Sequence, residues 1–278
     1  MAPVVDILIP NHNGREALAL CIESIARYTP EPHRVIVYDD GSTNPDEVKY
    51  LIRSQAAGLV SAVIIGPGHR GHGAALNVLV NGADPATEYA AVIDNDIQIL
   101  RAGWLTELRA LADSGANVLA VCDDKTTTGY CSRGYRPEMF FFWFGMLKMS
   151  AYRDGMLTDW AMTEARRDVE PWASKFAALY PPEDNAEWQR LRATQPWYCD
   201  FDREKVIFDP GATLWAKMRY DNPKGYVARP LTPSLRRSFR HWGHAQSWLN
   251  GDNASTPYGA VMRRQINDEL RKLREEGR

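Results

Sequence analysis

The sequence predicts an α/β protein in which helices flank a mostly parallel sheet. Three observations support this fold class. The chain has 278 residues, of which 45% are hydrophobic and 24% are charged, the composition of an ordinary globular protein. Through the first hundred residues, short apolar runs alternate with segments of helical periodicity. These runs lack polar alternation, which is typical of parallel strands that are covered on both faces.

The first hundred residues contain four predicted strands and three predicted helices. Pro10 ends the first strand, and Pro45 followed by two acids is typical of the first turn of a helix. A glycine-rich loop, 66–73, precedes the third helix. The expected strands are 4–9, 35–38, 59–65 and 90–93, and the expected helices are 14–28, a segment from 45, and about 74–81.

Beyond Leu100 the alternation weakens. Residues 158–200 are rich in tryptophan, proline and charge and follow no clear pattern. The run 140–149 is apolar throughout and predicts a strand buried on both faces. The other expected elements are helices at 104–112, 211–218 and about 258–276, and a strand at 118–121.

Charge and cysteine usage limit the classes of partner and compartment. The net charge is -2 with a pI near 6.3, which argues against broad binding to nucleic acid or to anionic membranes. No run of 18 apolar residues is present, so we expect no transmembrane helix. The four cysteines show no CxxC spacing, and the first residues do not resemble a signal peptide. A cytoplasmic protein is therefore expected.

Polar residues follow three of the predicted strands directly. They are 11–13 after the first strand, Asp39 and Asp40 after the second, and Asp94 and Asp96 after the fourth. Ligands of an open parallel sheet bind beyond the carboxyl ends of the strands. Several carboxylates at one edge are unfavourable unless a positive group lies among them. A divalent cation that carries a phosphorylated ligand would provide it.

Asp94 and Asp96 form an Asp-x-Asp triplet at the end of the fourth strand. In an extended segment, residues two apart point to the same side. Both carboxylates can therefore bind one Mn²⁺ or Mg²⁺ ion and leave positions open for diphosphate oxygens. The simpler alternative for an isolated triplet is a strand end with two solvated acids.

The Asp-x-Asp triplet is the last of four motifs along the chain, and the four together are more informative than the triplet alone. They are Ile7-Leu8-Ile9-Pro10-Asn11-His12-Asn13, Val37-Tyr38-Asp39-Asp40-Gly41-Ser42-Thr43, Gly71-His72-Gly73-Ala74-Ala75-Leu76-Asn77 and Val92-Ile93-Asp94-Asn95-Asp96. In this order they resemble the family 2 glycosyltransferases, which use nucleotide sugars and have the GT-A fold, a Rossmann-like sheet. The resemblance is best over the first hundred residues and returns in part near the C-terminus.

The resemblance implies roles for residues of the N-terminal half. Asp94 and Asp96 match the metal-binding triplet. Arg70 lies in the glycine-rich loop, from which it could reach a base or a phosphate; an ordinary surface arginine is the alternative. The positions that match donor-binding residues are Pro10, Asn13, Asp39, Asp40, Arg70, Asp94 and Asn95.

The resemblance also implies a general base and a further metal ligand in the C-terminal half. The best match for the base is Asp209, which would deprotonate the acceptor hydroxyl. A helix-capping aspartate is the alternative there. His241 would be the additional metal or diphosphate ligand, with His244 as its alternative. Competing candidates for the base are Asp159, Asp200 and Asp202.

Three further patterns have both functional and structural interpretations. The HxxH spacings at His69/His72 and His241/His244 are compatible with zinc, although no third ligand is suggested. No acid occurs between Asp221 and Asp252, so this basic stretch would bind diphosphate or an anionic acceptor, or it is a solvated loop. Tryptophans that could line an acceptor groove, or belong to the core, are Trp160, Trp172, Trp197, Trp242 and Trp248.

From these observations we expect a metal-dependent glycosyltransferase that inverts the anomeric carbon, with retention as the alternative. The donor would be a UDP-sugar or a related nucleotide sugar, the cofactor Mn²⁺ or Mg²⁺, and the acceptor a glycan, a lipid-linked sugar or a small molecule. Charge disfavours nucleic acid, while the basic stretch leaves DNA open. The rival classes are a non-catalytic binding relative and an Asp-x-Asp phosphatase. Residues 1–100 would bind the donor, 101–225 the acceptor, and 226–278 would close the site with a basic loop and a C-terminal helix.

Overall fold

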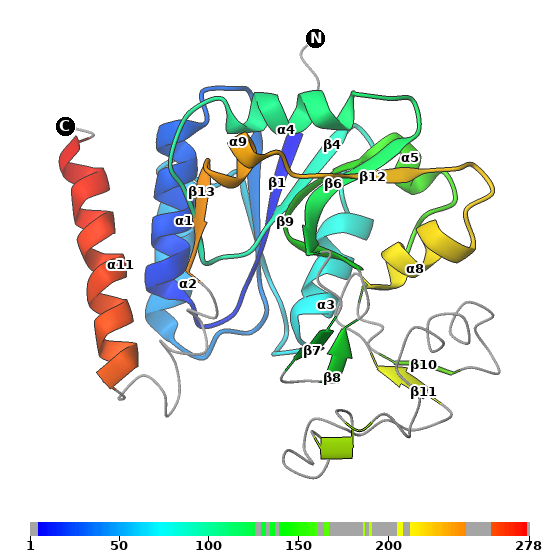
Figure 1. Ribbon diagram of the computed structural model, residues 1–278. Helices are drawn as coiled ribbons and strands as arrows, with labels where there is room; N and C mark the ends of the chain where they lie inside the picture. Colours follow the sequence, from blue (N-terminus) through cyan, green and yellow to red (C-terminus); the bar gives the residue numbers. More distant parts are fainter. Residues whose placement is uncertain are drawn as a thin grey trace.

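The computed structural model describes residues 5–125, 129–131, 134–136, 139–160, 164–166, 186, 189–190, 205–207, 212–242 and 257–276. Seven strands form the central sheet in the order β12-β6-β9-β4-β1-β2-β3 (Figure 1). Neighbouring strands are parallel except that β9 is antiparallel to both β4 and β6. The strands are β1 (Val5–Asn11), β2 (Arg34–Asp39), β3 (Ala62–Ile65), β4 (Tyr89–Ile93), β6 (Val118–Lys125), β9 (Met139–Lys148) and β12 (Val227–Pro230).

Helices cover both faces of this sheet, which confirms the predicted fold class (Figure 1). One face packs against α1, α2, α4 and α9, and the other against α3, η1, α5 and α8. The helices are α1 (Arg15–Tyr28), α2 (Pro45–Ala56), α3 (His72–Leu76), η1 (Asn77–Asn81), α4 (Trp104–Ala112), α5 (Met149–Arg153), α8 (Ala212–Tyr220), α9 (Pro233–Arg236) and α11 (Pro257–Glu276).

The central strands are apolar on both sides because each side faces a helical layer. In β1, Ile7 and Ile9 belong to one core cluster, and Leu8 belongs to the other. All three side chains are fully buried. This two-sided burial explains why the sequence shows a continuous apolar run instead of alternation.

Two-stranded sheets supplement the main sheet. The pair that matters for the site is β5 (Ile97–Ile99) with β13 (Phe239–His241), which are antiparallel. This pairing joins the segment after β4 to residues about 140 positions later in the chain. The other pairs are β7 (Gly129–Cys131) with β8 (Gly134–Arg136), and β10 (Glu164–Arg166) with β11 (Lys205–Ile207).

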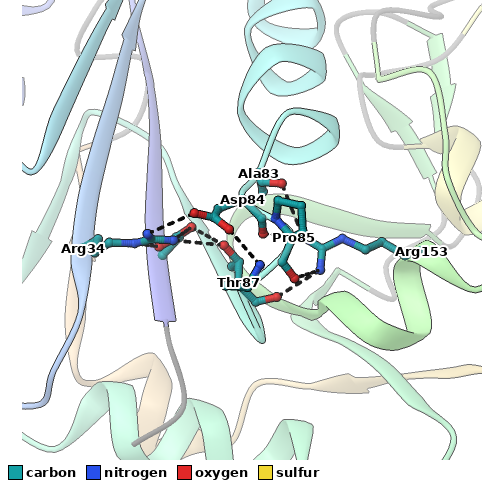
Figure 2. Close-up of polar contacts among 8 residues, drawn as sticks. Arg34, Ala83, Asp84, Pro85, Thr87 and Arg153 are labelled. Atoms are coloured by element: carbon teal, nitrogen blue, oxygen red, sulfur yellow. Dashed lines mark hydrogen bonds and ion pairs between the residues drawn. The ribbon is translucent and has the colours of Figure 1, made fainter. Parts of the chain in front are cut away.

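A polar network fixes the loop before β4 at the amino end of the sheet. Buried Asp6 accepts two hydrogen bonds from the Arg34 guanidinium, at 2.6 and 2.9 Å, and a third from the Thr87 hydroxyl. Figure 2 shows Arg34 beside Asp84, and the Arg153 guanidinium bonded to carbonyl oxygens of the same loop, residues 83–87. This network lies at the opposite end of the strands from the predicted site, so its role is structural.

The structure corrects several predicted boundaries. Pro10 does not end the first strand, because β1 continues through it and remains paired with β2 as far as Asn11. The strand predicted at 118–121 extends to Lys125. The third strand begins at Ala62 instead of 59, because residues 57–61 form the turn that follows α2. The third helix begins at His72 and continues as the π-helical turn η1 over Asn77–Asn81. None of the described helices combines the length and apolar composition needed to cross a bilayer.

Candidate active site at the carboxyl edge of the sheet

The polar residues that follow β1, β2 and β4 meet where the strand order changes direction. β2 and β3 lie on one side of β1, and β4 lies on the other. Such a switch point leaves a crevice beyond the strand ends, where α/β proteins bind their ligands. Across it, the Asn95 amide donates a 2.7 Å hydrogen bond to the Asn11 side-chain oxygen.

The structure brings the three predicted metal ligands together. One carboxylate oxygen each from Asp94 and Asp96 and a ring nitrogen of His241 lie within 4.8 Å of one another. The His241 Nε2 is 3.2 Å from Asp96 Oδ1. Asp96 is buried, whereas Asp94 and His241 keep 26% and 31% of their side-chain surfaces exposed. The cluster therefore opens to a ligand on one side.

The β5–β13 pair explains how His241 reaches the triplet. His241 is paired with Ile97, the residue directly after Asp96. Beyond the pair, the Trp242 N–H donates a 3.0 Å hydrogen bond to the Asp96 carbonyl. In an antiparallel ribbon alternate residues face opposite sides. His241 therefore faces the aspartates, whereas Arg240 faces Glu269 of α11, at 4.0 Å.

The electrostatics of the cluster fit a divalent cation. Burial and, second, the nearby Asp96 carboxylate raise the pKa of Asp94 well above its ordinary value. Asp94 Oδ1 is buried and accepts no hydrogen bond from the described residues. Two carboxylates and an imidazole form a donor set suited to Mn²⁺, since carboxylates favour hard cations and imidazole favours transition metals. These residues therefore fit the metal that the sequence predicts.

His72 supplies a fourth group at the rim. Its Nε2 lies 3.7 Å from Asp94 Oδ1. The predicted alternative of a His69/His72 zinc site receives no support, because His69 contacts Asp40 through Nδ1 at 2.9 Å and stacks on His12. Among the described residues, the only group of three or more candidate ligands is Asp94, Asp96 and His241.

Asp39 and Asp40 organise the loops around the predicted donor site. Asp39 is fully buried and accepts hydrogen bonds from Asn11, from the Ser42 hydroxyl at 2.5 Å and from the Ser42 N–H at 3.1 Å. Asp40 Oδ2 accepts the N–H groups of Arg70 at 2.9 Å and Gly71 at 2.7 Å. Asp39 therefore fixes the turn after β2, and Asp40 attaches the glycine-rich loop to it.

The other predicted donor residues occupy three different settings. Pro10 is buried within β1. Asn13 has a left-handed backbone (φ 52°), a conformation that asparagine tolerates, and its Oδ1 accepts the Thr43 N–H at 2.8 Å. The Arg70 guanidinium donates a 3.1 Å hydrogen bond to the Tyr38 hydroxyl.

Glu47 is a site residue that the sequence interpretation missed. It is fully buried beneath the switch point, and its Oε1 accepts hydrogen bonds from Asn11 Nδ2 at 2.7 Å and from the Gly14 N–H at 2.8 Å. Burial is the main cause that raises the pKa of Glu47. A Cβ at position 14 would displace the Asn95 side-chain amide, which is hydrogen-bonded to Asn11. In the sequence, Glu47 looks like an ordinary first-turn acid.

Several residues predicted for the site lie outside the part of the chain that the structure describes. They are Asp209, Asp200, Asp202, His244, Trp172, Trp197 and Trp248. Asp159 is exposed and accepts a 2.5 Å hydrogen bond from Asn77. Trp160 is fully buried in the second core cluster, so of the two interpretations given for it the core position is confirmed. Trp242 is partly buried, and the Arg240 guanidinium lies over its ring at 5.2 Å.

Comparison with known protein families identifies the family of this chain. The model for Glycosyl transferase family 2 matches residues 6–161, more than half of the chain. The chain belongs to this family. Its mostly parallel sheet with flanking helices agrees with the GT-A fold that the resemblance implied. No curated protein matches the chain.

Solved structures with low sequence identity to the chain are also glycosyltransferases. S. aureus TarS 1-349 in complex with UDP-GlcNAc is 15% identical, with 95% of this chain and 72% of that chain covered and a TM-score of 0.41. The Pyrobaculum calidifontis mannosyltransferase PcManGT with GDP-Man and Mn²⁺ is 14% identical, with 98% and 86% covered and a TM-score of 0.43. GalNAc-T7 with UDP, GalNAc and Mn²⁺ is 13% identical, with 54% of this chain and 36% of that chain covered and a TM-score of 0.45. In another structure of S. aureus TarS 1-349 the match spans about half of that chain, 48%.

Proposed function

We propose that the protein is a metal-dependent glycosyltransferase that moves a sugar from a nucleoside-diphosphate sugar to an acceptor hydroxyl. The observation that carries the proposal is the convergence of Asp94, Asp96 and His241 at the switch point of the sheet. Membership of the family supports it. A glycan, a lipid-linked sugar or a small molecule remains the proposed class of acceptor.

In this proposal each group of the site has a defined task. Asp94, Asp96 and His241 would hold Mn²⁺ or Mg²⁺, which when bound would supply Lewis-acid stabilisation of the leaving diphosphate. The loops fixed by Asp39 and Asp40 border the base and ribose of the donor, for which we favour UDP. Pro10, Asn13, Asn95 and Arg70 lie in or beside these loops, where they would complete the donor site.

The acceptor half of the mechanism rests on the sequence. Asp209, or one of its competitors, would take the proton of the acceptor hydroxyl while that oxygen attacks the anomeric carbon. A single in-line displacement inverts the anomeric configuration. Residues 1–100 would thus bind the donor, 101–225 the acceptor, and 226–278 would close the site through β13.

A thermal-shift experiment tests the donor and the metal together. UDP, GDP, dTDP and CDP are each added with and without Mn²⁺. A ligand that binds only the folded state adds about 2.7 kcal/mol of stability at a hundred times its Kd. We expect one nucleotide, UDP by preference, to raise Tm only with Mn²⁺, and Asp96→Ala to abolish that rise.

The control is Asp46→Ala, which removes an exposed carboxylate on α2 and should keep the full shift. If no nucleotide raises Tm with any metal, the proposal loses its basis. Nucleotide binding with neither hydrolysis of the donor nor transfer of its sugar would instead favour a non-catalytic relative that only binds the nucleotide sugar.

A further inference from the structure

The indole of Trp143 lies flat against the imidazole of His241. Their ring centroids are 4.5 Å apart and their planes differ by 13°. Trp143 belongs to β9, and His241 belongs to β13, which pairs with β5 and not with β9. The stack therefore joins two strands that have no backbone pairing, at the one residue of β13 that is a candidate metal ligand.

The main chain of Trp143 contacts the other side of the same cluster. Its carbonyl oxygen accepts a 2.9 Å hydrogen bond from the Asp94 N–H. β9 and β4 are antiparallel, and their paired residues end at Ile93 and Phe144, directly before this bond. One residue of β9 thus contacts Asp94 through its backbone and His241 through its ring.

We propose that Trp143 is a positioning residue of the metal site, whose indole holds the His241 imidazole in the plane that directs Nε2 toward Asp96. This inference rests on the proposed function, since it concerns the same metal. The ring of a histidine otherwise rotates broadly about its terminal torsion. Because His241 keeps about a third of its side-chain surface exposed, a flat neighbour is needed to restrict that rotation.

Phe144, the next residue of β9, offers a matched control. It is fully buried, and its ring lies 4.0 Å from that of Phe239, the first residue of β13. Phe144→Leu therefore weakens the packing of β13 but leaves the indole–imidazole stack in place. If Trp143 only supported the packing of β13, substitutions at positions 143 and 144 would change Mn²⁺ affinity equally.

The experiment measures Mn²⁺ affinity by the electron paramagnetic resonance signal of free Mn²⁺, with UDP present. Groups that orient a metal-ligating histidine typically change metal affinity by 10- to 100-fold when they are removed. We expect Trp143→Leu to weaken Mn²⁺ binding by about tenfold, and Trp143→Phe, which keeps a flat ring, to restore most of it. Phe144→Leu should bind Mn²⁺ as the wild type does while its Tm falls.

Nuclear magnetic resonance of the wild-type protein tests the stack without any substitution. The ring protons of His241, assigned with His241→Asn, should be shifted upfield by the indole, and Trp143→Leu should remove this shift. Unshifted protons in the wild type, or equal Mn²⁺ affinity for wild type and Trp143→Leu, overturn the inference. Equal losses at positions 143 and 144 overturn it as well. If the wild type itself binds no Mn²⁺ in the presence of UDP, the proposed metal site is wrong, and the role of Trp143 that depends on it is wrong as well.

Discussion

At the scale of single residues, the acids of the switch point have two different surroundings. Both oxygens of Asp39 and the Oδ2 of Asp40 accept hydrogen bonds from loop N–H and side-chain donors. Asp94 lacks such donors at Oδ1 among the described residues, and burial beside Asp96 raises its pKa. Asp39 and Asp40 therefore fix the conformation of the loops around the site, and Asp94 and Asp96 supply carboxylates to it.

Burial of Glu47 should make the stability of the protein depend on pH. Its raised pKa means that the folded state holds a proton over a pH range in which the unfolded state has lost it. The contribution of Glu47 to stability is therefore fully present below its unfolded pKa and is lost as the pH rises through its folded pKa. We expect the free energy of unfolding of Glu47→Gln to exceed that of the wild type by more at pH 7 than at pH 4.

Urea unfolding at the two pH values measures this difference. Glutamine keeps an oxygen that can accept from Asn11 and Gly14, so the comparison isolates the buried charge. Glu275→Gln on α11, the same change at an exposed carboxylate, is the control. A constant difference between variant and wild type at both pH values would show that the Glu47 carboxyl does not titrate as the structure indicates.

At the scale of secondary-structure elements, α11 covers the outer side of α1. Ile266 is fully buried against Ala17, Ala19 and Leu20 of α1. Three ion pairs among the described residues, one of them Arg274 with Glu23 at 2.6 Å, flank the apolar contact. Since α1 starts at Arg15, directly after the loop that contains Asn13, we expect the packing of α11 on α1 to stabilise the predicted donor side of the site.

The packing of α11 is tested by Ile266→Ala. Removing buried methyl groups and leaving a cavity costs about 2–5 kcal/mol, whereas Ile266→Val should cost about 0.5–1.5 kcal/mol. Val261, which is 51% exposed on the same helix, is the control, since Val261→Ala should change stability by less than about 0.5 kcal/mol. These values are read from urea denaturation. A loss below about 1 kcal/mol for Ile266→Ala would mean that α11 is not docked as described.

At the scale of the whole molecule, the extent to which the sequence predicts the structure depends on the separation of the interacting residues. The strand ends could be predicted because apolar runs mark the strands, and parallel strands end at a common edge. His241 could be placed only through the family resemblance, since its pairing with β5 spans about 140 residues.

The contacts that the sequence did not reveal are side-chain contacts between distant segments. The run containing Trp143 looks like plain core, and nothing in it indicates a stack on an imidazole of β13. Glu47 looks like a first-turn acid because its burial depends on α2 packing beneath β1. The π-turn η1 was also unexpected; Asn77 and Asn81 within it bond to residues 158–160, far along the chain.

In the proposed function, Asp94, Asp96 and His241 form one metal site, although they come from the β4, β5 and β13 regions of the chain. A crystal structure with Mn²⁺ and UDP, in which anomalous scattering locates the metal, tests this site. We predict one anomalous peak in contact with all three side chains and with the diphosphate. A peak at His69 and His72, or one that leaves His241 uncoordinated, would contradict it.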